Sequence, residues 1–177
     1  MQREMVAELA TLYEQGGAEA FERASGLVGR NKGAALLFDW YATGALTDAD
    51  LPSVVADVWN GAEEPSKLLG VAQWVRFFRL AAYPPPTQPL TVYRGTTAGG
   101  RRGMSWTTDL EQARWFADRI VRMTGTKAEV VTVVAPPEAV LAIMDEVEPK
   151  GRMENEVVID PRLLPRVRRL EIRAQHE

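Results

Sequence analysis

Two glutamates separated by one residue, Glu154 and Glu156, come directly before the apolar run Val157-Val158-Ile159. Side chains alternate between the two faces of a strand, so both carboxylates would lie on one face. Carboxylates in such a place can stabilise a cationic transition state or take a proton from a nucleophile. The spacing therefore predicts carboxylate chemistry at the start of a buried strand, although two glutamates in a turn before a strand are also common by chance.

An arginine and two hydroxyls accompany earlier apolar segments. Arg94 ends the segment 90–94, and the planar fork of a guanidinium matches two oxygens of a phosphate. Ser105 and Thr107 are two residues apart and so face the same side of a strand, while Trp106 faces the other. Ordinary structural interpretations stay open: a strand-end arginine is more often part of an ion pair, and Thr107 also fits a strand that leads into a capped helix.

The rest of the composition limits the chemistry. The 177 residues include no cysteine and one histidine, His176, next to the last residue. Thiolate nucleophiles, Cys-ligated zinc, Ser-His-Asp triads and histidine bases therefore lack their central group, and no metal site is predicted. The sequence has no G-x-G-x-x-G after a strand and no G-x-x-x-x-G-K-[ST], which excludes Rossmann and P-loop nucleotide sites. Catalysis must rest on carboxylates, hydroxyls and arginines.

Proline-rich residues 84–89 separate two halves of different character, because such a run cannot continue a helix. We expect a helical subdomain over residues 1–86 and a strand-rich core over residues 87–177, which together make an α+β fold. Apolar periodicity predicts helices over 4–21, weakened or ended by Gly16-Gly17, over 34–42, from 47 to 61, and over 66–82.

The second half alternates short apolar strands with one helix. The helix is predicted over 109–123, opened by Thr108 and Glu111 as a capping box. Strands are predicted over 90–94, 103–107, 128–134, 140–144, 156–160 and 167–173.

Three segments of this half, taken in order, resemble the Arg, Ser-Thr-Ser and Glu-x-Glu signatures of arginine-class mono-ADP-ribosyltransferases, the cholera-toxin-like branch. They are the Tyr-Arg-Gly at 93–95, the Ser-Trp-Thr at 105–107 and the Glu-Asn-Glu at 154–156. The resemblance covers roughly residues 90–160 and implies a split, mainly antiparallel sheet on which the helical subdomain packs. The Ser-Thr-Ser segment reads Ser-Trp-Thr here, and only ten residues separate Arg94 from Ser105, fewer than in most toxin-like members.

The resemblance implies a role for each matching residue in binding and cleaving NAD, the substrate. Arg94 and Gly95 belong to the NAD-binding set, in which the arginine contacts phosphates, and Ser105 and Thr107 line the nicotinamide pocket. Glu156 would hydrogen-bond the nicotinamide ribose and stabilise an oxocarbenium-like transition state.

The remaining catalytic roles implied are bracing of that glutamate by Ser105, and orientation or deprotonation of the acceptor by Glu154. We expect strand order and face alternation to bring Arg94, Ser105 and Glu156 together in one cleft.

The function implied is mono-ADP-ribosyl transfer to a macromolecule, expected to be a host protein, with release of nicotinamide, as in compact phage or bacterial effectors and toxins. The loop 147–153 corresponds to the acceptor-recognition loop, and Lys150 and Arg152 within it suit an acidic protein surface or a nucleic acid; a solvated hairpin loop is equally open. Hydrolysis of NAD by the same site is one alternative. Another is a degenerate domain that binds a nucleotide or a host protein without chemistry.

Two further classes of function are less well supported by the sequence than these three. A divalent-metal nuclease would use the acidic set Asp145, Glu146, Glu148, Glu154 and Glu156, but the accompanying lysine and aspartate are not evident. General nucleic-acid binding fits poorly with a net charge of −3, although arginines gather near the C-terminus. Because the N-terminus lacks the features of a signal peptide and no stretch approaches ~18 apolar residues, we expect a cytoplasmic protein without a membrane partner.

Overall fold

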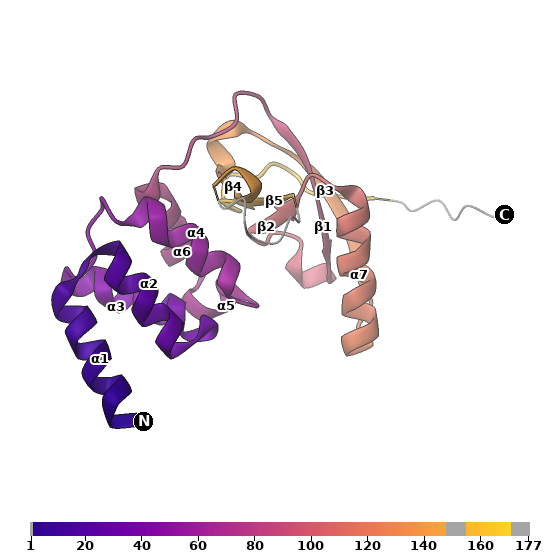
Figure 1. The fold of residues 1–177 in the computed structure, drawn as a ribbon. Helices are drawn as coiled ribbons and strands as arrows, with labels where there is room; N and C mark the ends of the chain where they lie inside the picture. The colour runs from indigo at the N-terminus through magenta and orange to yellow at the C-terminus, as the bar shows by residue number, and fades with distance from the viewer. Residues whose placement is uncertain (1, 148–154, 171–177) are drawn as a thin grey trace. The chain divides into compact units, whose positions relative to one another are not determined.

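The computed structural model describes residues 2–147 and 155–170, and the chain divides into two compact units, Met1–Tyr83 and Pro84–Glu177 (Figure 1). The boundary lies at the first of the prolines that the sequence suggested as a joint. Among the described residues the first unit contains only helices, and the second contains a six-stranded antiparallel sheet. The predicted α+β class is therefore confirmed.

Glycines with positive φ divide the first unit into shorter helices than the sequence predicts. The break at Gly16 was expected, but the chain re-enters a helix at Gly17 and continues to Val28. The single helix predicted over 66–82 is wrong, because Gly70 adopts φ 80°, which no α-helix contains. The helices are α1 (Gln2–Gln15), α2 (Gly17–Val28), η1 (Arg30–Lys32), α3 (Gly33–Thr43), α4 (Leu51–Gly61), α5 (Pro65–Leu69) and α6 (Val71–Ala81).

The helical unit is built around packed aromatic rings. Trp59 of α4 meets Trp74 of α6 edge to face, with ring centroids 5.1 Å apart, and Phe78 lies 5.4 Å from Trp59. The Trp74 indole N–H donates to the carbonyl oxygen of Pro65 at 2.6 Å, so this buried ring also connects α6 to the start of α5. No helix in the described ranges combines the length and apolar character needed to cross a bilayer.

The second unit has the strand order β4-β5-β2-β1-β3-β6, and every neighbouring pair is antiparallel. Two of these strands, β2 and β5, carry Ser105 and Glu156 and are only three and four residues long. The elements are β1 (Leu90–Thr96), η2 (Ala98–Gly100), β2 (Ser105–Thr107), α7 (Leu110–Thr124), β3 (Glu129–Ala135), η3 (Pro137–Ala139), β4 (Val140–Ile143), α8 (Met144–Val147), β5 (Glu156–Ile159) and β6 (Arg168–Arg169).

The helix α7 begins one residue later than predicted, with a different cap. Asp109, not Thr108, is the N-cap: one of its carboxylate oxygens accepts hydrogen bonds from the backbone N–H groups of Glu111 at 2.8 Å and Gln112 at 3.4 Å. The predicted capping box is therefore wrong by one position. Aspartate satisfies the free N–H groups and also places a negative charge at the positive end of the helix.

Helix α7 lies against β1 (Figure 1). This close approach depends on Gly95 in β1. A Cβ at this position would lie 2.1 Å from the carbonyl oxygen of Ala113 and 2.5 Å from the backbone nitrogen of Ala117. Tyr93, two residues earlier and on the same face, packs with Ala113, Ala117 and Val130. The opposite face carries the main apolar cluster, which includes Val92, Trp106, Val131, Val133, Val157 and Ile159.

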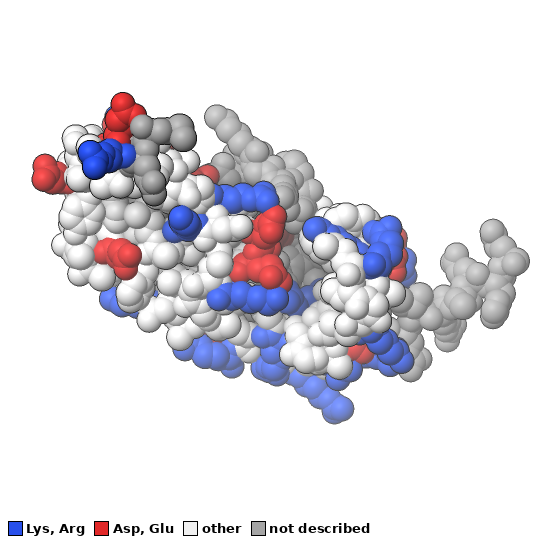
Figure 2. All heavy atoms as spheres, turned by 90° about the horizontal axis from the view of Figure 1, so that it is seen from below, with Lys and Arg blue, Asp and Glu red and all other residues white. Residues whose placement is uncertain are grey.

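Opposite charges are paired on the surfaces of both units. Lys67 pairs with Glu64 in the helical unit, and Arg114 pairs with Glu111 on α7. Acidic side chains also lie between basic ones on the face drawn in Figure 2. Exposed pairs contribute at most about 1 kcal/mol each, so the apolar cores, rather than surface charge, hold the two units folded.

We predict that Gly95→Ala lowers the free energy of unfolding by about 3 kcal/mol or more, because α7 must move away from β1 to accommodate the new methyl group. Chemical denaturation measures the change. Gly99→Ala is the matched control: a Cβ there meets nothing within 4 Å, so its stability should change by less than about 1 kcal/mol. Equal stability of the two variants would contradict the close packing of α7 on Gly95.

Candidate functional site

Strands β1, β2 and β5 place Tyr93 and two predicted site residues, Thr107 and Glu156, in one row across the sheet. Tyr93 of β1 is paired with Thr107 of β2, and Thr107 is paired in turn with Glu156 of β5. Residues directly opposed on antiparallel strands point to the same face, so the three side chains form a row on the α7 side. Ser105, two residues before Thr107, belongs to this face too.

A hydrogen bond joins two of the predicted catalytic residues. The Ser105 hydroxyl donates to Oε1 of Glu156 at 2.6 Å, and both residues are partly buried. A hydroxyl bond of this length to an ionised carboxylate is of the stronger, charge-assisted kind. Ser105 is therefore placed to orient the Glu156 carboxylate, which is the contact expected of a bracing residue.

Thr107 connects this row to the start of α7. Its side chain is only 5% exposed, and its hydroxyl oxygen accepts a hydrogen bond from the backbone N–H of Asp109 at 3.0 Å. This hydrogen bond supports the ordinary structural interpretation of Thr107, as the end of a strand that leads into a capped helix. The backbone N–H of Thr108 also donates to the carbonyl oxygen of Asn155 at 3.1 Å, next to Glu156.

The guanidinium of Arg94 donates two hydrogen bonds to backbone carbonyl oxygens of its own chain. Its Nε donates to the carbonyl oxygen of Gly100 at 3.0 Å, and Nη1 makes a short hydrogen bond to the carbonyl oxygen of Ser105. Gly103 leaves the space for this arrangement, since a Cβ there would lie 2.5 Å from Cζ of Arg94. Arg94 thus holds the connection between β1 and β2 in place.

The route by which Arg94 reaches the site differs from the expected one. Tyr93 lies on the α7 side, so alternation directs the Cα–Cβ bond of Arg94 to the opposite face of β1. The side chain nevertheless ends at the first residue of β2, where it contacts Ser105. Ser105 and Glu156 therefore share a strand face, whereas Arg94 reaches Ser105 from the opposite face through its guanidinium.

Charge links Arg94 with Glu156. Burial lowers the pKa of the Arg94 guanidinium from its ordinary value, and the negative charge of Glu156 opposes this shift. Arginine remains protonated at any pH the protein meets. The site consequently combines a permanent, partly buried cation with a carboxylate held by a hydroxyl.

Of the remaining predicted positions, one has a packing role and one lies outside the described residues. Gly95 points toward α7, where the helix backbone leaves no space for a side chain. Glu154 and loop residues 148–153 fall outside the described ranges. Asn155, directly before Glu156, adopts φ 49°, a left-handed conformation that asparagine tolerates better than most residues.

The sequence patterns did not predict that two glycines accommodate the side chain of Arg94. Gly100 supplies a carbonyl acceptor and Gly103 supplies space, although both read only as turn glycines in the sequence. Nothing in the spacing of these two glycines before Ser105 predicts that they surround the side chain of an arginine. Within the described ranges, no three acidic or histidine side chains are grouped as a metal ion would require, and Glu148 and Glu154 of the alternative acidic set lie outside those ranges.

No protein-family model, curated protein or solved structure matches this chain. Functional assignment therefore rests on the geometry of the described site and on the order of the short motifs that carry it.

We predict that Arg94→Lys lowers the free energy of unfolding by about 1.5–3 kcal/mol, because one ammonium cannot replace both charge-assisted bonds to the carbonyl oxygens of Gly100 and Ser105. Arg122→Lys, on the exposed last turn of α7, is the control and should stay within about 0.5 kcal/mol of the unchanged protein. Denaturant titration measures both variants. A negligible loss for Arg94→Lys would mean that its two bonds do not hold the β1–β2 connection.

Proposed function

We propose that this protein is an NAD-dependent mono-ADP-ribosyltransferase of the arginine class, whose catalytic core lies in residues 87–177. The observation that carries the proposal is the hydrogen bond from Ser105 to Glu156, made beside the partly buried cation of Arg94. The arginine, serine and glutamate come from β1, β2 and β5 in the order of the family's signatures. The absence of cysteine and of any histidine before His176 supports chemistry that depends on a carboxylate.

Glu156 would act on the bond between C1′ of the ribose and the nicotinamide nitrogen. As this bond breaks, nicotinamide leaves with the bonding electron pair and positive charge develops on the ribose. A fixed carboxylate stabilises that charge most strongly in the transition state. Ser105 keeps the carboxylate oriented, so little reorganisation is needed when the charge appears.

Arg94 would support this step from inside the fold. Two of its donor groups are already bonded to backbone carbonyl oxygens, so its main contribution is to fix the start of β2 and to place a positive charge near Glu156. Any contact with the phosphates of NAD would use the other N–H groups of the same guanidinium. Thr107 and Gly95 would shape the surroundings through their contacts with α7.

The acceptor would be a macromolecule, in our proposal a protein of a host cell, as for compact phage or bacterial effectors. Its nucleophilic atom forms a new bond to C1′ and loses a proton, which Glu154 would accept or direct away. Lys150 and Arg152 would attract an acidic acceptor surface. With water in place of the macromolecule, the same step would hydrolyse NAD.

One observation favours the degenerate-domain alternative. The Nε and Nη1 groups of Arg94 are already bonded to backbone carbonyl oxygens, and only ten residues connect Arg94 to Ser105. The site therefore offers fewer groups to bind phosphate than a transferase of this class would use. A domain of that kind would bind a nucleotide or a host protein without breaking a bond. Turnover separates it from the transferase.

We predict that Glu156→Gln reduces nicotinamide release from NAD by about a hundredfold or more, because the amide keeps the shape of the side chain but not the charge that stabilises the transition state. Release is followed by chromatography, with and without a host-cell lysate as the source of acceptor. Glu138→Gln changes an exposed glutamate of η3 in the same way and should retain full activity.

Labelling of NAD on the adenylate phosphate distinguishes the possible products in the same experiment. Label on macromolecules supports the transferase, and label only in free ADP-ribose supports the hydrolase. If the unchanged protein releases no nicotinamide with any acceptor, the binding-domain alternative replaces the proposed enzyme.

A further inference from the structure

The Ser105–Glu156 hydrogen bond depends on the register between two very short strands. Strand β2 has three residues and β5 has four, and they pair from Ser105 with Val158 to Thr107 with Glu156. A shift by one residue would turn each side chain to the other face of the sheet. Few backbone hydrogen bonds resist such a shift, so another contact must help to hold the register.

The backbone ladder between these strands cannot continue far beyond Ser105. The N–H of Ile159 donates to the carbonyl oxygen of Met104 at 2.8 Å, which extends the pairing by one step. The same register, extended further, places Arg102 opposite Pro161. Proline has no N–H, so the next backbone bond is not available at this point.

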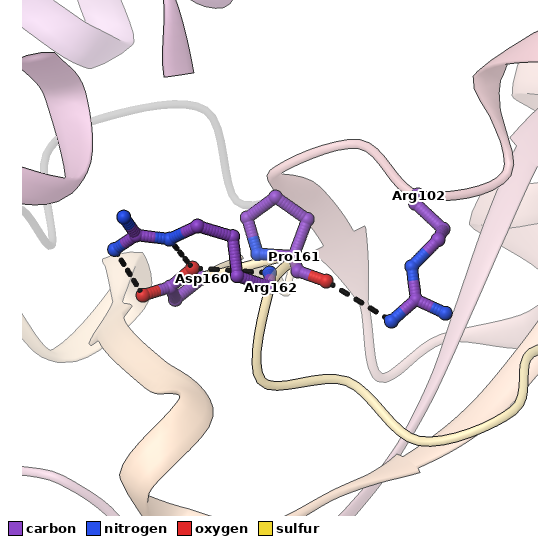
Figure 3. Close-up of polar contacts among 4 residues, drawn as sticks. All are labelled: Arg102, Asp160, Pro161 and Arg162. Atoms are coloured by element: carbon purple, nitrogen blue, oxygen red, sulfur yellow. Dashed lines mark hydrogen bonds and ion pairs between the residues drawn. The ribbon is translucent and has the colours of Figure 1, made fainter. Parts of the chain in front are cut away.

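The side chain of Arg102 occupies the place where backbone pairing stops. Its Nη2 donates to the carbonyl oxygen of Pro161 at 3.2 Å (Figure 3). The same nitrogen donates to the carbonyl oxygen of Leu164, and Nη1 lies 3.4 Å from the carbonyl oxygen of Pro165. One guanidinium thus connects the residue three positions before Ser105 with the segment that follows β5. A lysine could not present donors in this forked arrangement.

A second arginine pairs with Asp160, the residue directly before Pro161, which carries one of the acceptors for Arg102. Arg162 donates from Nε and Nη2 to the two carboxylate oxygens of Asp160, at 2.9 and 2.8 Å, while its backbone N–H donates to Oδ1 at 3.1 Å (Figure 3). The Asp160 residue is 2% exposed, and its own N–H donates to the carbonyl oxygen of Ala139 at 2.8 Å. The turn after β5 is therefore fixed on both sides of Pro161.

We propose that Arg102 is a positioning residue: it locks β2 in register with β5 and thereby keeps the Ser105 hydroxyl on the Glu156 carboxylate. It acts through the backbone carbonyl oxygens of Pro161, Leu164 and Pro165 and not by touching a substrate. The lock lies at the end of the strand pair away from Glu156, where it resists sliding without occupying the site.

Amide hydrogen exchange tests the lock directly. In Arg102→Ala the exchange rate of the Ile159 amide, which bonds to Met104, should rise by about tenfold or more, because local opening of the β2–β5 pair becomes easier. Arg166→Ala removes an exposed arginine from the segment after β5, where the acceptors of Arg102 lie, and should leave that amide unchanged. Arg102→Lys should give an intermediate rate. An unchanged Ile159 rate in folded Arg102→Ala overturns the proposal.

The second measurement rests on the proposed function. Arg102→Ala should lower kcat for nicotinamide release by about tenfold with KM for NAD within about twofold, since a displaced carboxylate affects the transition state more than binding. Combining it with Ser105→Ala should add little further loss, because both changes release the same carboxylate. Faster Ile159 exchange with an unchanged kcat overturns the positioning role and leaves Arg102 purely structural.

The two measurements test different claims, so one claim can be rejected while the other is kept. If the unchanged protein releases no nicotinamide, the proposed function is rejected, and the exchange rates still decide whether Arg102 holds the register that joins Ser105 to Glu156.

Discussion

The arrangement of the site depends on where the guanidinium of Arg94 finds its hydrogen-bond acceptors. A partly buried cation is costly unless its N–H groups are bonded, so the chain that follows β1 must bring carbonyl oxygens to it. Gly100 and Ser105 do this, and Gly103 makes the approach possible. The short connection between β1 and β2 is thus shaped around one side chain, and it leads directly into the serine that bonds to Glu156.

Side chains align the strands of this site where backbone ladders are too short to do so. The pair β1–β3 has seven registered positions, but β2 and β5 share only three. Arg94 fixes one end of β2 from β1, Arg102 extends the β2–β5 pairing past Pro161, and Thr107 joins the other end of β2 to α7. A carboxylate on such short strands can be held firmly because each strand end is bonded to a neighbour.

Local patterns in the sequence predicted much of the fold. Apolar periodicity predicted α3 closely and the end of α4, although α4 begins only at Leu51. Alternation predicted the face shared by Ser105 and Thr107. Both are short-range properties of the chain. The split at Gly70 was missed because apolar periodicity continues through it, and only the backbone conformation reveals the break. The sequence predicts Thr108 as the cap of α7 because a threonine hydroxyl can also accept hydrogen bonds from the first N–H groups of a helix.

The sequence suggested residues for the proposed site but not their geometry. Motif order selected Arg94, Ser105 and Glu156, yet alternation alone misplaced Arg94, since a long side chain can return across the end of a strand. The roles of Gly103 and Arg102 depend on contacts between segments that are distant in sequence. No local pattern encodes such contacts.

A crystal structure of the Glu156→Gln protein with NAD tests the central claim most directly, because loss of turnover should leave the dinucleotide intact. If the site is a transferase site, the hydroxyls of the nicotinamide ribose should lie at about 3 Å from the side chain at position 156, with nicotinamide beside Ser105. NAD bound away from these residues, or no bound NAD at a saturating concentration, would contradict the assignment.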